Sequence, residues 1–284
     1  SNWRAESSLE EDLMKQGVVG ISGIDTRALT RHLRDRGAMR VGIFSGLSLT
    51  REEMVVKVRQ SPSMSGAFLA DDVSTPEPYV VTPPQGVKEE FVVAALDLGI
   101  KAATPRNMAL RGMTVHVLPL RTSYEDIKAL NPDGLFLSNG PGDPATMDSV
   151  VEVVQQALSD RLPVFGICFG QQILGRALGF ETYKLRFGHR GINQPVLNTR
   201  TQRVEITAHN HGFAVEAPTS GEFTTVYGKG VVSHLCLNDG VVEGLQLLER
   251  PAFSVQYHPE AAAGPHDANY LFDQFAEMMR SARA

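Results

Sequence analysis

The stretch Pro163-Val-Phe-Gly-Ile-Cys-Phe-Gly-Gln-Gln172 indicates the fold more clearly than any other part of the sequence. Its first half, 163–167, is a continuous apolar run that predicts a buried strand, and its second half continues as a helix. Small residues two positions before and after Cys168 are typical of a tight strand–turn–helix, because larger side chains would collide there. We therefore interpret Cys168 as a nucleophile whose thiolate is stabilised by the helix amino terminus. The alternative is a buried structural cysteine.

Predicted strands alternate with helical patterns around this stretch. The strands are expected at 91–96, 115–118, 134–137 and 163–167. The helices that separate them are expected to begin near Thr104, Tyr124 and Met147, with one more after Cys168. Strands that are apolar on both faces and separated by helices indicate an α/β fold with a mainly parallel sheet covered on both faces. Beyond Gln202 we expect short strands with glycine turns, and then a closing helix with an apolar stripe of Leu271, Phe275, Met278 and Met279.

The amino-terminal part has a different composition. Residues 76–90 are rich in proline and acids without helical or strand periodicity, which predicts a linker between residues 1–75 and a larger domain at 91–284. Within 1–75, Asp25 and Thr50 are candidate helix caps, and 41–44 predicts a strand, so we expect part of a smaller α/β domain. Because the chain starts without an initiator Met, we interpret 1–75 as the remainder of an amino-terminally truncated domain.

Composition excludes several classes of function. The 284 residues carry a net charge of −5 and no dense Lys/Arg block, so generic binding to nucleic acid or to an anionic membrane is not expected. The longest apolar runs are far shorter than the roughly 20 residues that a membrane helix needs. Two cysteines do not form a disulfide framework, and we therefore expect a cytoplasmic protein.

A thiol nucleophile needs a base, and the base needs a group that orients it. The run 253–257 predicts a strand that ends at His258-Pro-Glu260. Residues two apart on extended backbone project to the same side, and the proline between them favours that conformation. Glu260 could then hold the imidazole of His258 while this faces Cys168. The sequence thus predicts a catalytic triad of Cys168, His258 and Glu260.

Two further segments are candidates for the same pocket. Asn-Gly-Pro-Gly-Asp-Pro at 139–144 follows a predicted strand, and its N–H groups could help to form an oxyanion hole, although a plain turn is the alternative. Ala-His-Asn-His-Gly-Phe at 208–213 could contact the substrate. His209 and His211 could equally be surface histidines or metal ligands. No Cys or carboxylate cluster accompanies them at a recognisable spacing, so we do not expect a structural zinc site.

These motifs together resemble a known family. The segments 139–144, 166–172, 209–213 and 258–260 resemble, in order and spacing, the class I glutamine amidotransferase domain, which implies a flavodoxin-like α/β fold over about residues 91–280. More narrowly, the chain is similar to the small-subunit family of carbamoyl-phosphate synthetase. The segments that carry this narrower resemblance are 23–37, 187–196 and 263–267. The alternatives are a glutaminase subunit of another amidotransferase, of the anthranilate or GMP synthesis type, and an inactive binding fragment.

The resemblance implies a mechanism and a partner. Cys168 would attack the side-chain amide of L-glutamine to form a glutamyl thioester, while His258 shuttles protons and Glu260 holds His258. Ammonia would pass through a tunnel to a large synthetase subunit. That subunit uses ATP with Mg²⁺ and bicarbonate to make carbamoyl phosphate for arginine and pyrimidine biosynthesis. This chain is expected to hold no cofactor and no metal of its own.

The resemblance also assigns contacts to glutamine at positions that match the family motifs. These contacts are Gly140, Gly142, Phe169, Gln172, Asn210, Gly212 and Phe213. The chain departs from the family at Gln171, Arg190 and Gln194, where histidine is common. None of the three is a triad position, so activity is expected to survive.

Overall fold

The computed structural model describes residues 5–46, 49–261 and 264–283. The chain divides into two compact units, 1–63 and 64–284, which are described separately here. The boundary lies ahead of the expected linker at 76–90, which belongs to the larger unit. The reason is strand β1 (Tyr79–Val81), which pairs antiparallel with β3 (Met113–Pro119) and so joins this segment to the sheet edge.

The smaller unit is helical in its described residues. Its helices are α1 (Leu9–Lys15), α2 (Thr26–Arg36) and α3 (Arg51–Gln60). The predicted caps are confirmed: the Asp25 side chain accepts from the N–H of Ala28, and Thr50 forms a reciprocal capping box with Glu53. None of the three helices contributes a buried residue. Local capping, rather than a core, therefore defines these helices.

The smaller unit differs from expectation in two respects. The prediction of a strand at 41–44 is wrong, since the described residues of this unit contain no strand. A strand is stable only when its backbone pairs with a neighbour, and no described residue of this unit provides one. Helix α1 was not predicted, although its capping box of Ser8 and Glu11 is the sequence signal for a helix start.

The larger unit is built on an eleven-stranded sheet in the order β1-β3-β2-β4-β5-β11-β10-β9-β6-β7, with β8 paired to β9. Besides β1 and β3, the strands are β2 (Phe91–Asp97), β4 (Gly134–Leu137), β5 (Val164–Ile167), β6 (Glu181–Asn198), β7 (Arg203–Glu216), β8 (Glu222–Thr225), β9 (Gly228–Cys236), β10 (Val242–Leu247) and β11 (Ala252–Val255). Strands β3, β2, β4, β5 and β11 run parallel, as predicted. All other pairings are antiparallel.

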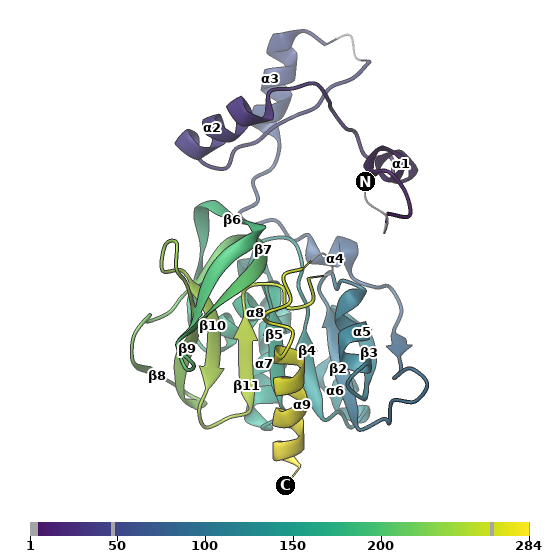
Figure 1. Cartoon of the computed structure of the whole chain (residues 1–284), viewed down its shortest axis with the longest axis vertical. Helices are drawn as coiled ribbons and strands as arrows, with labels where there is room; N and C mark the ends of the chain where they lie inside the picture. Colours follow the sequence, from purple (N-terminus) through teal and green to yellow (C-terminus); the bar gives the residue numbers. More distant parts are fainter. Residues whose placement is uncertain (1–4, 47–48, 262–263, 284) are drawn as a thin grey trace. The chain divides into compact units, whose positions relative to one another are not determined.

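Helices cover both faces of the parallel strands (Figure 1). They are α4 (Ala70–Val73), α5 (Ala103–Ala109), α6 (Tyr124–Ala129), α7 (Asp148–Ser159), α8 (Phe169–Ala177) and α9 (Leu271–Ala282), with a short 3-10 turn at Pro144–Thr146. Helix α5 begins one residue before Thr104, so Thr104 lies in its first turn and is not the cap that we expected. None of the described helices is long and apolar enough to cross a membrane.

Two apolar cores lie against opposite faces of the parallel sheet. Alternate residues of β2 show the division: Val93 and Ala95 belong to the core that includes α9, whereas Ala94 and Leu96 belong to the core that includes α7. Phe165 on β5 is the centre of an aromatic cluster with Phe136, Phe253, Phe272 and Phe275. Burial on both faces is the reason that these strands have continuous apolar sequences.

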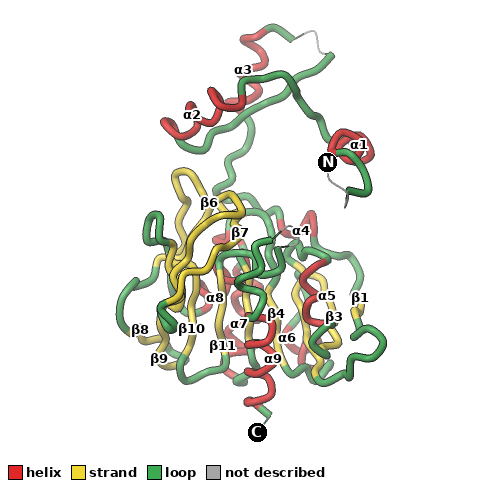
Figure 2. The backbone as a smooth tube through the Cα atoms, viewed as in Figure 1, coloured by secondary structure: helices red, strands yellow, loops and turns green. Residues whose placement is uncertain are grey.

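The region after residue 180 is less like its prediction. Beyond Gln202, β8, β10 and β11 are short strands of 4, 6 and 4 residues, as expected. The exception is β7, which is 14 residues long and forms an extended antiparallel ribbon with the 18-residue β6 (Figure 2). Strand β6 was not predicted, because its polar sequence contains Gly188, Gly191 and Pro195, which are typical of turns. Irregularities in the register after Lys184 and after Gly191 accommodate these residues within the ribbon.

Candidate active site

Cys168 occupies the turn between β5 and α8. Its backbone has φ 55° and ψ −100°, in the left-handed region that non-glycine residues rarely adopt, and its N–H donates to the Val255 carbonyl (2.8 Å). A Cβ on Gly166 would lie 2.6 Å from the Gly170 carbonyl oxygen, and a Cβ on Gly170 would collide with the Leu137 carbonyl. The two glycines therefore have the steric role predicted from the sequence, and Cys168 sits on strained backbone.

His258 and Glu260 follow β11, the parallel neighbour of β5. The Nδ1–H of His258 donates to Glu260 Oε1 at 2.7 Å, and both side chains are buried. The expected extended backbone is wrong, however: 258–261 form a turn in which the Ala261 N–H donates to the His258 carbonyl (3.2 Å). This turn still brings the carboxylate to the imidazole. The side chain of Cys168 lies close enough to the imidazole of His258 to shift its pKa, so the structure brings the three predicted triad residues together.

The charges of the site reinforce one another. Burial alone would lower the pKa of His258, but the charge and hydrogen bond of Cys168, together with Glu260, raise it to about 10. Burial alone would raise the pKa of Glu260, but His258 and then Lys101 lower it. The arrangement therefore favours an imidazolium at His258, held by the carboxylate of Glu260 beside Cys168.

Lys101 is a member of the site that the sequence analysis missed. Its Nζ lies 3.2 Å from Glu260 Oε1; the Lys101 side chain is 49% exposed, whereas the carboxylate is fully buried. Lys101 follows the carboxyl end of β2, the edge of the parallel sheet at which Cys168 also lies. The position of Lys101 just after a predicted strand was the signal in the sequence, because functional side chains come together at the carboxyl ends of parallel strands.

The 139–144 segment lies beside the turn of Cys168, because the Gly170 N–H donates to the Ser138 carbonyl (3.1 Å). The surrounding backbone requires glycine at two positions of this segment, whether or not a ligand binds there. A Cβ on Gly140 would collide with the Leu98 carbonyl, and Gly142, at φ 106°, faces the Ala67 carbonyl. The chain's own backbone approaches both glycines closely, and their contact with glutamine stays a prediction.

The remaining predicted contacts lie on α8 and on β7. Phe169 is the first residue of α8, so its N–H belongs to the turn of the helix that has no intrahelical acceptor. Gln172 is buried, and its Nε2 donates to the Phe213 carbonyl (2.9 Å), which links α8 to β7. Asn210 is exposed on β7 and Gly212 is partly buried. The structure thus joins Gln172 to Phe213, while binding of glutamine by these residues is untested.

The structure also brings together three histidines and a glutamate from segments that are far apart in the sequence. His209 and His211 are buried, and His189 on β6 and Glu243 on β10 lie next to them. The interpretation of His209 and His211 as surface histidines is therefore wrong, and the fold adds a carboxylate that the sequence spacing did not indicate. Sequence spacing could not reveal Glu243, because β10 reaches the cluster through the sheet.

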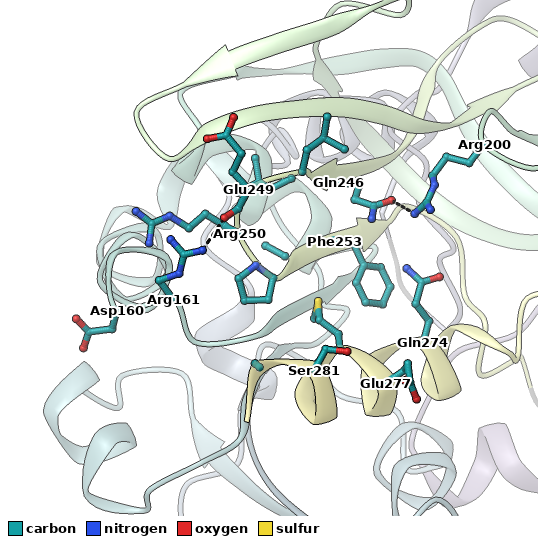
Figure 3. A pocket seen from close by; sticks show the side chains of 16 residues that line it. Asp160, Arg161, Arg200, Gln246, Glu249, Arg250, Phe253, Gln274, Glu277 and Ser281 are labelled. Atoms are coloured by element: carbon teal, nitrogen blue, oxygen red, sulfur yellow. Dashed lines mark hydrogen bonds between the residues drawn. The ribbon is translucent and has the colours of Figure 1, made fainter. Parts of the chain in front are cut away.

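A separate groove lies at the other end of the parallel strands. It has a volume of about 900 Å³, and its lining includes Arg161 before β5, Arg250 before β11, and Gln274 on α9 (Figure 3). Cys168 and His258 follow the opposite ends of these same strands. The groove is therefore distinct from the candidate active site, and the chemistry described above does not use it.

Comparisons with known proteins agree with this geometry. The model of the class I glutamine amidotransferase family matches residues 94–278, and that of the carbamoyl-phosphate synthase small chain, CPSase domain, matches residues 1–43. A carbamoyl phosphate synthase small chain from Streptomyces avermitilis is 65% identical, over 100% of this chain and 74% of the relative. The protein of the same name from Mycobacterium tuberculosis is 60% identical, over 98% and 75%.

Among solved structures, a putative GMP synthase component from Thermoplasma acidophilum superposes with a TM-score of 0.56. The superposition covers 69% of this chain and 97% of that one, at 17% identity, and bears on the fold alone. The family match and the high identity to the two small chains go further. On these grounds the chain belongs to the carbamoyl phosphate synthase small chain family of class I glutamine amidotransferases.

Proposed function

We propose that this chain is the glutamine-hydrolysing subunit of a carbamoyl-phosphate synthase. The observation that carries the proposal is the buried triad, in which Glu260 accepts a 2.7 Å hydrogen bond from His258 and His258 in turn contacts Cys168 on a strained turn. A thiol, a base and a carboxylate that orients the base are the groups that acyl transfer through a cysteine requires.

The first half of the reaction releases ammonia. The Cys168 thiolate attacks the side-chain amide carbon of glutamine, and the carbonyl oxygen becomes an oxyanion. His258 is a cation in the resting site, so it gives its Nε2 proton to the leaving nitrogen. The carbon–nitrogen bond breaks, ammonia departs, and a glutamyl thioester remains on Cys168. Glu260 keeps the imidazole in the orientation that points its other nitrogen toward Cys168.

The second half of the reaction restores the enzyme. His258, now neutral, takes a proton from water, and the hydroxide attacks the thioester carbon. The carbon–sulfur bond breaks, glutamate leaves, and thiolate and imidazolium are regenerated. The N–H of Phe169, the first residue of α8, would stabilise both oxyanions.

The ammonia would be consumed by a large synthetase subunit. Membership of the small chain family supports such a partner, which would bind ATP with Mg²⁺ and bicarbonate and make carbamoyl phosphate for arginine and pyrimidine synthesis. We propose no cofactor for hydrolysis within this chain, because thiolate, imidazole and water account for each step. A cytoplasmic location and glutamine contacts at Gly140, Gly142, Asn210 and Gly212 are part of the same proposal.

Glutamate release from glutamine tests this function. The chain would be assayed alone and with a carbamoyl-phosphate synthase large subunit, each beside Cys168→Ala. We expect release that depends on Cys168 and increases when the large subunit is added. Release that persists in Cys168→Ala would refute the triad, and release that the large subunit leaves unchanged would refute the partner.

A further inference from the structure

We propose that His189, His209, His211 and Glu243 bind one divalent transition-metal ion, with zinc the best fit. The four residues come from β6, β7 and β10, and one ligand atom from each lies within 4.8 Å of all the others. Three imidazoles and one carboxylate are a donor set that zinc prefers. None of these residues belongs to the proposed triad, and the site goes beyond glutamine hydrolysis.

The separations between the donor atoms suit a four-coordinate ion. Zinc–nitrogen bonds of about 2.0–2.1 Å in a tetrahedron imply ligand atoms about 3.4 Å apart. His209 Nδ1 lies 3.3 Å from His211 Nε2 and 3.6 Å from Glu243 Oε2. Glu243 Oε1 lies 3.1 Å from His189 Nδ1 and 3.8 Å from His211 Nε2. The other separations lie within 4.8 Å, so an ion would have to draw the ligand atoms closer together by up to about 1.4 Å.

The outer nitrogen of each imidazole has its own acceptor. His189 Nε2–H donates to the Asp239 carboxylate (2.8 Å), and His211 Nδ1–H donates to the Phe213 carbonyl (2.8 Å). His209 Nε2 lies 2.7 Å from the hydroxyl of Thr207, which itself donates to a backbone carbonyl and so accepts from the imidazole. For His209 and His211 these contacts favour a proton on the outer nitrogen and a lone pair directed inward, the arrangement typical of histidines that bind metal. His189 Nδ1 lies 3.1 Å from Glu243 Oε1, so an ion would take the place of the proton that joins these two atoms.

The inner side of the cluster brings imidazole nitrogens and carboxylate oxygens to hydrogen-bond distance of one another, and one oxygen is left without a donor. The carboxylate of Glu243 is fully buried, and its Oε2 makes no hydrogen bond with any described residue. The side chains of His209 and His211 are also buried, with exposed fractions of 0% and 2%. A cation would satisfy all four inner atoms at once. A proton shared between His209 and His211 is the alternative that the experiment must exclude.

The backbone of these strands supports the proposed catalytic loop. The His258 N–H donates to the Ala208 carbonyl (2.9 Å), next to His209, and the Gln256 N–H donates to the carbonyl of Glu243 itself (2.8 Å). An ion held by four protein ligands, three of them buried and His189 partly buried, leaves no position open for substrate, which is typical of a structural site. We infer that the ion would cross-link three strands at the point where they hold the turn of His258.

Zinc binding tests this proposal directly. The full chain, stripped with a chelator and then freed of it, would be titrated with Zn²⁺ in competition with a chromophoric chelator, and bound metal would be measured by mass spectrometry. A Cys168→Ser background removes the active-site thiol, and Cys236→Ser in the same background removes the second thiol, which lies close to His189 and Asp239. We expect one zinc per chain. Loss of a residue that only hydrogen bonds to a metal ligand weakens metal binding by roughly 10- to 100-fold. We expect His209→Gln and Glu243→Gln, which each remove a ligand itself, to weaken zinc binding by more than this.

Two further variants make the result unambiguous. Asp239→Asn alters only an outer partner with a half-exposed carboxylate, so the chain should fold and bind zinc about 10- to 100-fold more weakly. His116→Gln, on β3 outside the cluster, should leave affinity unchanged. Co²⁺ in the Cys168→Ser background should give four-coordinate ligand-field bands.

Absence of stoichiometric zinc in the parent chain, or equal affinity in His209→Gln and the parent chain, would overturn the site. Because the titration contains no glutamine, either outcome is independent of the proposed hydrolysis.

Discussion

Addition of one methyl group at Gly166 should disable the proposed nucleophile. A Cβ there would lie 2.6 Å from the Gly170 carbonyl oxygen and 2.7 Å from its carbon, whereas ordinary contact begins at 3.4 Å. Gly166 does not have the positive φ that would add backbone strain, so the effect is steric. The end of β5 and the first turn of α8 must separate by about 0.8 Å, and Cys168 lies between them.

The expected losses follow from that displacement. Overpacking of this kind costs about 1–3 kcal/mol of the free energy of unfolding. A misplacement of the reacting groups by close to 1 Å costs on the order of 100-fold in rate. We therefore expect Gly166→Ala to lower kcat/KM for glutamine by about 100-fold while the chain stays folded.

The assay is glutamate release at several glutamine concentrations, with urea unfolding on the same samples. Gly20→Ala is the matched control, because its Cβ would meet only a leucine methyl carbon at 3.4 Å and its backbone also lacks a positive φ. If Gly166→Ala hydrolysed glutamine as fast as the control, the steric reasoning about the Cys168 turn would be wrong.

Further predictions concern the charges and the core. Cys168→Ala should lower the pKa of His258 from about 10, because the substitution removes the strongest of the interactions that raise this pKa. Imidazole ¹⁵N NMR as a function of pH would measure the shift, and an unchanged titration of His258 would contradict the prediction. Glu260→Gln should lower the same pKa and should reduce kcat for glutamine far more than Lys101→Met. The partly exposed Lys101 pair contributes at most about 1 kcal/mol, or roughly fivefold in rate, and that effect should shrink in high salt. Phe165→Ala should reduce the free energy of unfolding by about 3–5 kcal/mol in urea titrations, because it empties the centre of an aromatic cluster.

The parallel half of the fold could be predicted from sequence because its signals are local. Strands such as 134–137 are buried on both faces, so their apolar residues are contiguous, and the observed β4 has the same limits. The Cys168 turn was predictable for a similar reason. Its steric requirement falls on Gly166 and Gly170, which are close to it in sequence.

The antiparallel half of the fold could not be predicted in the same way, because it depends on contacts between residues that are far apart in the sequence. Strand β6 has a polar, glycine-containing sequence that predicts turns, and only its pairing with β7 and β9 makes it a strand. Conversely, 41–44 has the composition of a strand but no partner among the described residues. Pairing, rather than local propensity, decided both outcomes.

The candidate site could be predicted where its residues lie in short sequence motifs. It could not be predicted where the folded sheet brings distant residues together. Cys168, His258 and Glu260 lie in short motifs, although Glu260 reaches His258 through a turn and not through extended backbone. Lys101 and the Glu243 cluster depend on distant strands, so their partners are visible only in the folded chain.

The most direct test of the central claim is to trap the reaction intermediate on Cys168. The chain would be mixed with glutamine, quenched in acid during turnover, digested, and mapped by mass spectrometry. We predict a glutamyl group on the peptide that contains Cys168, absent from a hydroxylamine-treated sample because that reagent cleaves thioesters. Turnover that continues with no adduct on Cys168, or an adduct on another residue, would contradict the assignment of Cys168 as the nucleophile.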